Sequence, residues 1–236
     1  MTTAFATTTL ALPTTRTSAD TLTGTTLEEA RPRLRGRLHQ LCAFASVPAG
    51  AHLVAGADPA NRPAALAHAA TWTAMFVTSA TYHRLAHSPT TRRRMRRADH
   101  SMIFVHIGGA ATALALLCMT PLLALLVLAP VWCAIATGIG LKVTRLADGG
   151  SAGSWLYAVV GASQLLALPA ISAALTPGQL TLLVMSGTLY GTGAVLFFQK
   201  RPDPLPTIFG YHEVWHCFTL VAGLAQYALV HQLVGA

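Results

Sequence analysis

Seven stretches of mainly apolar residues alternate with short polar connectors along this chain. They cover residues 38–57, 64–82, 100–119, 122–141, 153–171, 180–198 and 208–233. Each stretch is close to the ~20 residues that an α-helix needs to cross a bilayer, and turn-forming pairs such as Ser88-Pro89 and Thr120-Pro121 lie between them. Because a backbone in hydrocarbon must satisfy its own hydrogen bonds, the pattern predicts an all-α membrane protein, a bundle of seven transmembrane helices.

The composition supports this class of protein. Of the 236 residues, 53% are hydrophobic and only 10% are charged, whereas a water-soluble domain carries about 25% charged residues. The net charge of +8 would also fit a nucleic-acid-binding protein, but the polar stretches hold too few aromatic residues for a base-stacking platform. The expected partners are therefore membrane lipids and not nucleic acid. The four cysteines form no C-x-x-C pair, so they predict neither a disulfide framework nor a cysteine-bound metal.

Positive charge predicts the orientation of the helices, because lysine and arginine accumulate in cytoplasmic loops. A cytoplasmic amino terminus places fifteen of the 16 lysine and arginine residues on the inner side and leaves Arg62 alone outside. We therefore expect a multi-pass protein of the plasma membrane with its amino terminus in the cytoplasm. Residues 1–30, rich in threonine and alanine, are expected to form a disordered tail ahead of a transmembrane domain that covers residues 31–236.

The last apolar stretch opens with two histidines four residues apart, in the run Phe209-Gly-Tyr-His-Glu-Val-Trp-His216. On a helix, His212 and His216 lie on one face, a spacing that suits two bonds to one zinc ion. With Glu213 between them the run reads H-E-x-x-H, the pattern in which a metalloprotease helix supplies two ligands and a general base. By itself, the motif fits a pair of packed histidines at a helix start equally well.

Other polar groups are predicted to lie at the same depth in the membrane. With the amino terminus inside, the end of the second helix brings His83, the start of the third brings Asp99, and the start of the seventh brings His212 and His216 to the cytoplasmic rim. Ser79 precedes His83 by four residues and shares its helix face. Three histidines leave the fourth zinc position to water, which the carboxylate could orient or deprotonate. Ionisable groups in membrane segments mark functional sites by default.

Alternatives stay open for several of these residues. Asp99 follows five arginines and, taken alone, is typical of a helix N-terminal charge or a salt-bridge partner. His87 is a rival ligand, although Ser88-Pro89 predicts that the second helix frays there. A protease that used Glu213 as its base would need a third ligand downstream. The only downstream candidate, His231, lies roughly 22 Å further along the helix, at the other face of the membrane.

The remaining histidines and the glycine pairs have simpler interpretations. His106 is expected to be a packed, hydrogen-bonded histidine of the third helix. His52 and His68, near the outer ends of the first two helices, are expected to pair with each other. Gly108-Gly109 and the Gly187-x-x-x-Gly191 run are expected to allow close helix packing.

Several runs of this sequence resemble the hemolysin III proteins of bacteria, which are related to the progestin and adiponectin receptors. The similarity covers about residues 31–235. The runs that carry it are Pro32-Arg-Leu-Arg-Gly36, Ser79-Ala-Thr-Tyr-His-Arg84, Arg96-Arg-Ala-Asp-His-Ser-Met-Ile-Phe104, Leu189-Tyr-Gly-Thr-Gly-Ala-Val195, Lys200-Arg-Pro-Asp-Pro204 and Phe209-Gly-Tyr-His-Glu-Val-Trp-His216.

The resemblance implies a seven-helix bundle with a cytoplasmic amino terminus and a zinc ion near the inner leaflet. It implies that His83, His212 and His216 bind the zinc, that Asp99 acts through water, and that Ser79 supports the site. The grouping of this family with alkaline ceramidases implies metal-dependent hydrolysis, and the family name comes from a cell-lysing activity attributed to one member.

Two segments depart from the family pattern. Where the family tends to read Gly-Thr-Tyr-Thr-Pro, this chain has Gly109-Ala-Ala-Thr-Ala113, so that Ala111 and Ala113 replace a tyrosine and a kink-forming proline. A straighter third helix is expected. In the last helix Gln226-Tyr227 stands where the family often has a histidine before a tyrosine.

The leading hypothesis is a zinc-dependent membrane hydrolase that cleaves an amide or ester bond of a lipid, with Asp99 and Ser79 at the reaction and three histidines on the metal. One alternative is a receptor-like or membrane-perturbing protein in which the zinc is structural. A third is an intramembrane zinc protease that uses Glu213. The sequence specifies neither the lipid nor the oligomeric state.

Overall fold

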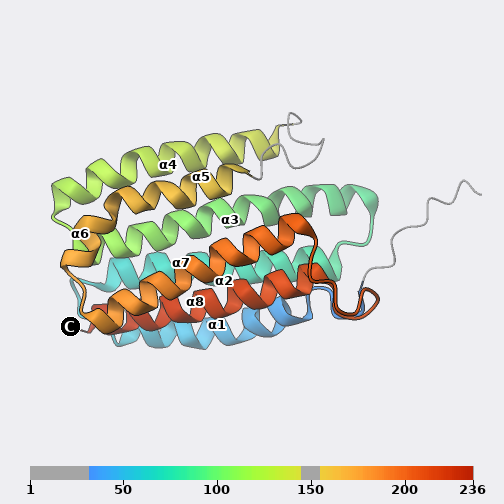
Figure 1. Ribbon diagram of the computed structural model, residues 1–236, viewed down its shortest axis with the longest axis horizontal. Helices are drawn as coiled ribbons and strands as arrows, with labels where there is room; N and C mark the ends of the chain where they lie inside the picture. The colour runs from blue at the N-terminus through green and yellow to red at the C-terminus, as the bar shows by residue number, and fades with distance from the viewer. Residues whose placement is uncertain (1–31, 145–154, 236) are drawn as a thin grey trace, which may run out of the picture. The chain divides into compact units, whose positions relative to one another are not determined.

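The computed structural model describes residues 32–144 and 155–235, and this part of the chain is helical without a β-strand (Figure 1). The predicted all-α class is confirmed. The predicted tail of residues 1–30 and the connector at residues 148–150 lie outside the described residues. The helices are α1 (Arg37–Ala55), α2 (Arg62–Leu85), α3 (Pro89–Cys118), α4 (Pro121–Val143), α5 (Trp155–Ser163), the 3-10 turn η3 (Gln164–Ala167), α6 (Leu168–Ala173), α7 (Pro177–Gln199) and α8 (Tyr211–Val234).

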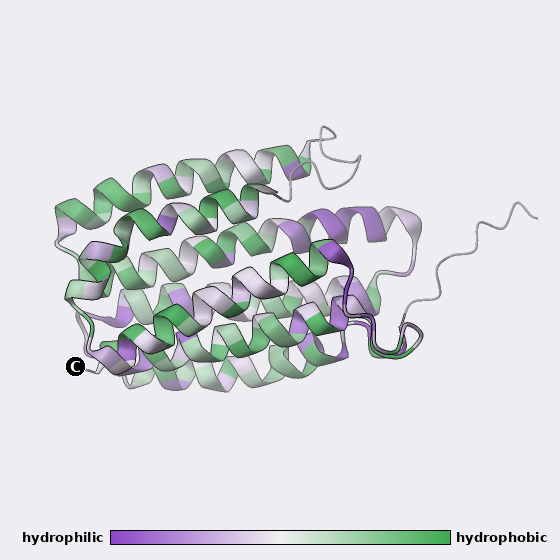
Figure 2. Cartoon of the chain, viewed as in Figure 1, coloured by the Kyte–Doolittle hydropathy of each residue, from purple (hydrophilic) through white to green (hydrophobic). Residues whose placement is uncertain are grey.

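Within the described ranges, 5 helical segments are long and apolar enough to cross a membrane: α3, α4, the α5–η3–α6 segment Leu156–Ala173, α7 and α8. Large apolar side chains are exposed on these helices, for example Leu122 and Leu126 on α4 and Leu166 in η3, as a lipid-facing surface requires. Figure 2 shows the hydrophobic residues along α4 and the hydrophilic first turns of α3. The membrane class is therefore supported, whereas α1 and α2 fall below the hydropathy of the other five and the count of seven spans stays a prediction.

The helices that carry the predicted site lie at the centre of the bundle. α2 packs along both α1 and α3, α7 packs along α8, and α8 also touches α1, α2 and α3. On the other side of α3, α4 and α5 cover it (Figure 1). The largest fully buried side chains include Phe76 of α2, Phe104 of α3 and Leu229 of α8, so all three helices contribute to the apolar core.

The start of α3 differs from the prediction. The helix begins at Pro89 and not at residue 100, because Ser88 is its N-cap: the Ser88 hydroxyl accepts a hydrogen bond of 3.2 Å from the backbone N–H of Thr91, and proline suits the first helical position. The arginine cluster assigned to a connector therefore lies on the helix. Asp99 lies well inside α3, so the prediction that it marks the helix start is wrong, as is its interpretation as a helix N-terminal charge.

Close helix packing is found at one of the two predicted glycine pairs. A Cβ atom on Gly109 would lie 2.0 Å from the Thr71 Oγ1 atom, so α2 and α3 approach each other there as predicted. A Cβ on Gly187 or Gly191 would meet no described atom within 4 Å, and the prediction for this pair is wrong because α7 faces α8 through Gly193 instead. α3 continues without a break through Ala111 and Ala113, both buried.

This packing predicts that Gly109→Ala destabilises the protein and that Gly187→Ala does not. The added methyl group at position 109 must push α2 and α3 apart, an overpacking cost of about 1–3 kcal/mol, whereas at position 187 it only gains helix propensity, up to about 1 kcal/mol. Thermal unfolding of both variants in detergent micelles measures the difference. Equal melting temperatures would contradict the close α2–α3 approach.

Candidate metal centre

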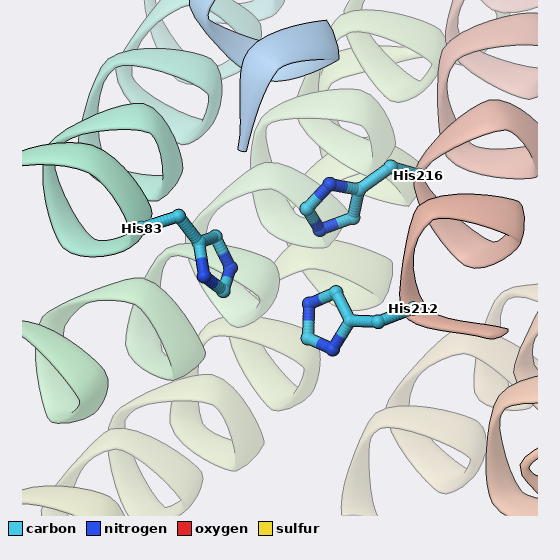
Figure 3. A group of neighbouring side chains, drawn as sticks. All are labelled: His83, His212 and His216. Carbon is cyan, nitrogen blue, oxygen red and sulfur yellow. The ribbon is translucent and has the colours of Figure 1, made fainter. Parts of the chain in front are cut away.

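Three histidines from two distant parts of the chain meet at one end of the bundle (Figure 3). His83 comes from the last turn of α2, and His212 and His216 come from the first turns of α8. One ligand nitrogen of each histidine lies within 4.8 Å of the other two. The ring centroids are 4.9, 5.4 and 4.7 Å apart. The structure therefore brings together the three residues that the sequence singled out as metal ligands.

The geometry of these rings fits a zinc ion. Zinc–nitrogen bonds of 2.0–2.1 Å in a tetrahedral site place ligand nitrogens about 3.4 Å apart, so small side-chain rotations are enough to close the observed spacing. His83 and His216 are buried and His212 is half-buried, which keeps water away from most of the site. Among the described residues no other group of three or more histidine, cysteine or acidic side chains has this spacing. Three imidazoles without a fourth protein ligand are typical of an open zinc site.

The glutamate of the motif builds the start of α8. One carboxylate oxygen of Glu213 accepts a 2.9 Å hydrogen bond from the backbone N–H of Gly210, the N-cap residue. The other oxygen forms an ion pair with the Arg35 guanidinium group. Glu213 is only 3% exposed, and both of its oxygens are engaged in holding the helix end. This arrangement gives no support to Glu213 as the base of a protease.

The segment before α1 packs directly on the histidine cluster. The backbone N–H groups of Arg33 and Leu34 donate hydrogen bonds of 2.9 and 3.0 Å to the carbonyl groups of Thr207 and Ile208, just before α8. Gly36 has a positive φ of 76°, and a Cβ there would lie 2.4 Å from the Cβ of His83. Only glycine combines this conformation with such a close approach. The contact of this segment with the site was not predicted from the sequence.

Asp99 and Ser79 lie beside the histidine cluster and not in it. Ser79 is buried at 3% exposure, and its side chain lies close to that of the half-buried Asp99. The metal-spaced group among the described residues contains the three histidines without Asp99. The structure thus pairs Asp99 with Ser79 and leaves the histidines as the ligand set.

A further histidine, His39 of α1, belongs to this region and was not predicted. Its side chain is 4% exposed, its Nδ1 atom lies 2.8 Å from the Ser79 hydroxyl, and its ring stacks on His216 with the centroids 3.7 Å apart. The signal in the sequence was a histidine near the start of the first apolar stretch, at the depth predicted for the other site residues. His52 lies near the opposite end of that stretch, away from this depth.

The other histidines are distributed around the bundle. His52 stacks on His231 with 5.5 Å between ring centroids, whereas His68 is fully buried beside His106. The predicted pairing of His52 with His68 is therefore wrong, because the two point to different neighbours. The Nε2 atom of His106 lies 3.0 Å from the Tyr190 hydroxyl, which confirms a hydrogen-bonded, packed histidine. His87 is exposed beyond the end of α2 and lies outside the cluster.

The buried ion pair predicts strong coupling between Arg35 and Glu213. Either Arg35→Gln or Glu213→Gln leaves a charge without its partner, at a cost of about 3–5 kcal/mol. The double variant should be more stable than the sum of the two single losses predicts, with a coupling of about 0.5–3 kcal/mol. Denaturant unfolding of the four proteins measures this coupling, with Arg33→Gln, an exposed neighbour, as the control. Additive losses would mean that the ion pair does not hold the site.

Comparison with known proteins agrees with this arrangement. Residues 28–227 match the family described as haemolysin-III related. The Hemolysin-3 homolog of Bacillus subtilis (strain 168) is 26% identical over 156 residues, which are 66% of this chain and 70% of that protein. The Hemolysin-3 of Bacillus cereus is 28% identical over 134 residues, 57% of this chain and 58% of that protein, so the match spans a little more than half the length of this second relative. The family match covers most of the chain, and the protein belongs to the haemolysin-III related family.

Proposed function

We propose that this protein is a zinc-dependent membrane hydrolase that cleaves an amide or ester bond of a lipid, chemistry of the ceramidase kind. The observation that carries the proposal is the convergence of His83, His212 and His216 within 4.8 Å, with a carboxyl group and a serine hydroxyl beside them. Membership of the haemolysin-III related family agrees with a multi-pass membrane protein. The proposal of catalysis rests instead on the three histidines and the polar side chains near them.

The proposed topology has seven crossing segments and a cytoplasmic amino terminus. α1 and α2 owe their lower hydropathy to polar side chains that face the bundle, such as His39, His68 and Ser79, all buried. These residues do not meet lipid, so they do not prevent the helices from crossing. The histidine cluster lies at the end of the bundle where α3 carries its exposed arginines (Figure 2), and positive residues favour the cytoplasmic side. The site would then lie near the inner leaflet.

The residues of this chain would divide the chemistry as follows. His83, His212 and His216 hold the metal through one ring nitrogen each. Zinc, when bound, supplies Lewis acidity, which polarises a carbonyl group and makes water more acidic. Asp99 accepts the proton of the attacking water and returns it to the leaving amine or alcohol, as a general base and then a general acid. Ser79, whose side chain lies close to Asp99, helps to position the carboxyl group.

The environment of the site favours a lipid substrate. The bundle exposes apolar residues to the membrane on most of its helices, and the site lies near headgroup depth in the proposed topology, where the amide or ester bond of a lipid is found. Arg93, Arg94 and Arg96 are exposed nearby, and basic side chains at this level attract anionic headgroups. The Bacillus relatives carry the name Hemolysin-3, which favours a second candidate, a membrane-perturbing protein with a structural zinc.

Two variants separate the metal ligands from the catalytic residue. His216→Ala removes a ligand and should abolish both stoichiometric zinc and lipid hydrolysis. Asp99→Asn should keep its zinc and lower the rate of hydrolysis by about 10²–10⁴, the contribution of a general base. Zinc is measured by elemental analysis of the purified protein. Hydrolysis is measured as fatty acid released from a panel of lipid amides and esters.

His87→Ala is the matched control, because His87 is exposed and lies just beyond α2; it should keep both zinc and activity. Zinc retained by His216→Ala would remove the ligand assignment. If the wild-type protein holds zinc but releases no fatty acid from any lipid of the panel, the hydrolase proposal is wrong. The second candidate, a protein with a structural zinc, would then be favoured.

A further inference from the structure

His39 touches a proposed metal ligand and the proposed catalytic pair at the same time. It enters from the first turn of α1, a helix that contributes no metal ligand. Its ring lies nearly parallel to that of His216, with an interplanar angle of 11° and 3.7 Å between centroids. The edge of Phe76 meets the ring from another side, at 5.1 Å and 69°. His216 therefore cannot tilt toward α1 without displacing a side chain that is itself packed in place.

Both ring nitrogens of His39 have hydrogen-bonding neighbours. Nδ1 lies 2.8 Å from the Ser79 hydroxyl oxygen, and Nε2 lies 3.4 Å from the Thr219 hydroxyl oxygen. Thr219 is one turn beyond His216 and is also 2.9 Å from the His216 carbonyl oxygen. In this arrangement His39 is not a fourth metal ligand, because its two nitrogens are already occupied. It joins α1 to α2 through Ser79 and to α8 through Thr219.

The hydrogens around His39 identify its tautomer. The Thr219 hydroxyl has one hydrogen and donates it to the His216 carbonyl oxygen, so toward the His39 Nε2 atom it can only accept. Neutral His39 therefore carries its hydrogen on Nε2, and its Nδ1 atom accepts the hydrogen bond of the Ser79 hydroxyl. The ring thus fixes the Ser79 side chain, which lies close to Asp99.

We propose that His39 is a positioning residue of the metal centre: its ring fixes the plane of His216, and its Nδ1 atom holds the Ser79 hydroxyl beside Asp99. The first half requires a metal held by the three histidines, and the second half rests on the proposed hydrolase function. Residues that orient metal ligands contribute about 10–100-fold to metal affinity. An uncharged histidine inside a membrane bundle is also costly without such a role.

Three substitutions separate the two contacts. His39→Phe keeps a flat ring against His216 and removes both hydrogen bonds. His39→Asn keeps a side-chain hydrogen-bond acceptor for Ser79 and removes the stacked ring. His39→Ala removes both contacts. His52→Phe is the matched control, because His52 lies on the same helix and stacks on His231, away from the site. Zinc affinity is measured by chelator competition, and the visible absorption spectrum is recorded with Co²⁺ in place of zinc.

His39→Ala should lower zinc affinity about 10–100-fold and change the Co²⁺ spectrum, because His216 loses its support. His39→Phe should stay closer to the wild type in both properties and still lose most lipid hydrolysis, because no hydrogen bond holds Ser79 in place. His39→Asn should recover part of that hydrolysis relative to His39→Ala. His52→Phe should match the wild type. Melting temperatures establish which variants are folded, and His39→Phe decides the outcome if His39→Ala is not.

The outcomes separate this inference from the proposed function. A wild-type protein that binds metal, with affinity and Co²⁺ spectrum unchanged in His39→Ala and His39→Phe, overturns the positioning role alone. Metal binding without hydrolysis of any lipid overturns the proposed catalysis and the Asp99 half of the inference, while the spectra still decide the His216 half. A wild-type protein that binds neither Zn²⁺ nor Co²⁺ overturns both.

Discussion

The ion pair between Arg35 and Glu213 is the interaction on which the geometry of the site depends. It joins residues 178 positions apart and ties the segment before α1 to the first turn of α8. A charged pair in a nearly water-free setting is stable only while both partners are present. Because Glu213 also caps α8 through Gly210, the same carboxylate sets where the helix begins and therefore where His212 and His216 point. Gly36, next to Arg35, brings the chain against His83.

Part of the polar interior of the bundle forms a connected set, whereas other buried groups, such as both ring nitrogens of His68, have no hydrogen-bonding partner among the described residues. Asp99 meets Ser79, Ser79 meets His39, and His39 meets Thr219, so that four helices, α1, α2, α3 and α8, share one chain of hydrogen-bonding neighbours. Polar groups that satisfy each other inside the bundle cost much less than polar groups facing lipid. This explains how α1 and α2 can be less apolar than the other helices while the outward surface stays hydrophobic.

The features that the sequence predicted correctly depend on residues that are close together in the chain. The four-residue spacing of His212 and His216 is a property of any helix, and the apolar stretches follow from the thickness of a bilayer, so the all-α class and the two histidines on one face could be read directly. His83 required the alternation of helices as well as the resemblance to the hemolysin III proteins. The structure brings its ring to within 5.4 Å of the other two rings.

The features that were missed depend on contacts between distant segments. His39 meets Thr219 across 180 positions. The start of α3 was misplaced because Ser88-Pro89 was interpreted only as the end of one helix, although a serine followed by proline is also a strong helix start. Gly187 and Gly191 have the spacing of a helix-packing motif, but they lie on the face of α7 that is turned away from α8. Which face of a helix is covered is a property of the assembled bundle.

X-ray absorption at the zinc edge of the purified protein tests the central claim most directly, because it identifies the atoms bound to the metal without an assumption about the reaction. The account predicts one zinc per chain with three imidazole nitrogens and one further oxygen at about 2.0–2.1 Å. A sulfur atom at about 2.3 Å, fewer imidazoles, or a protein that contains no zinc would contradict it.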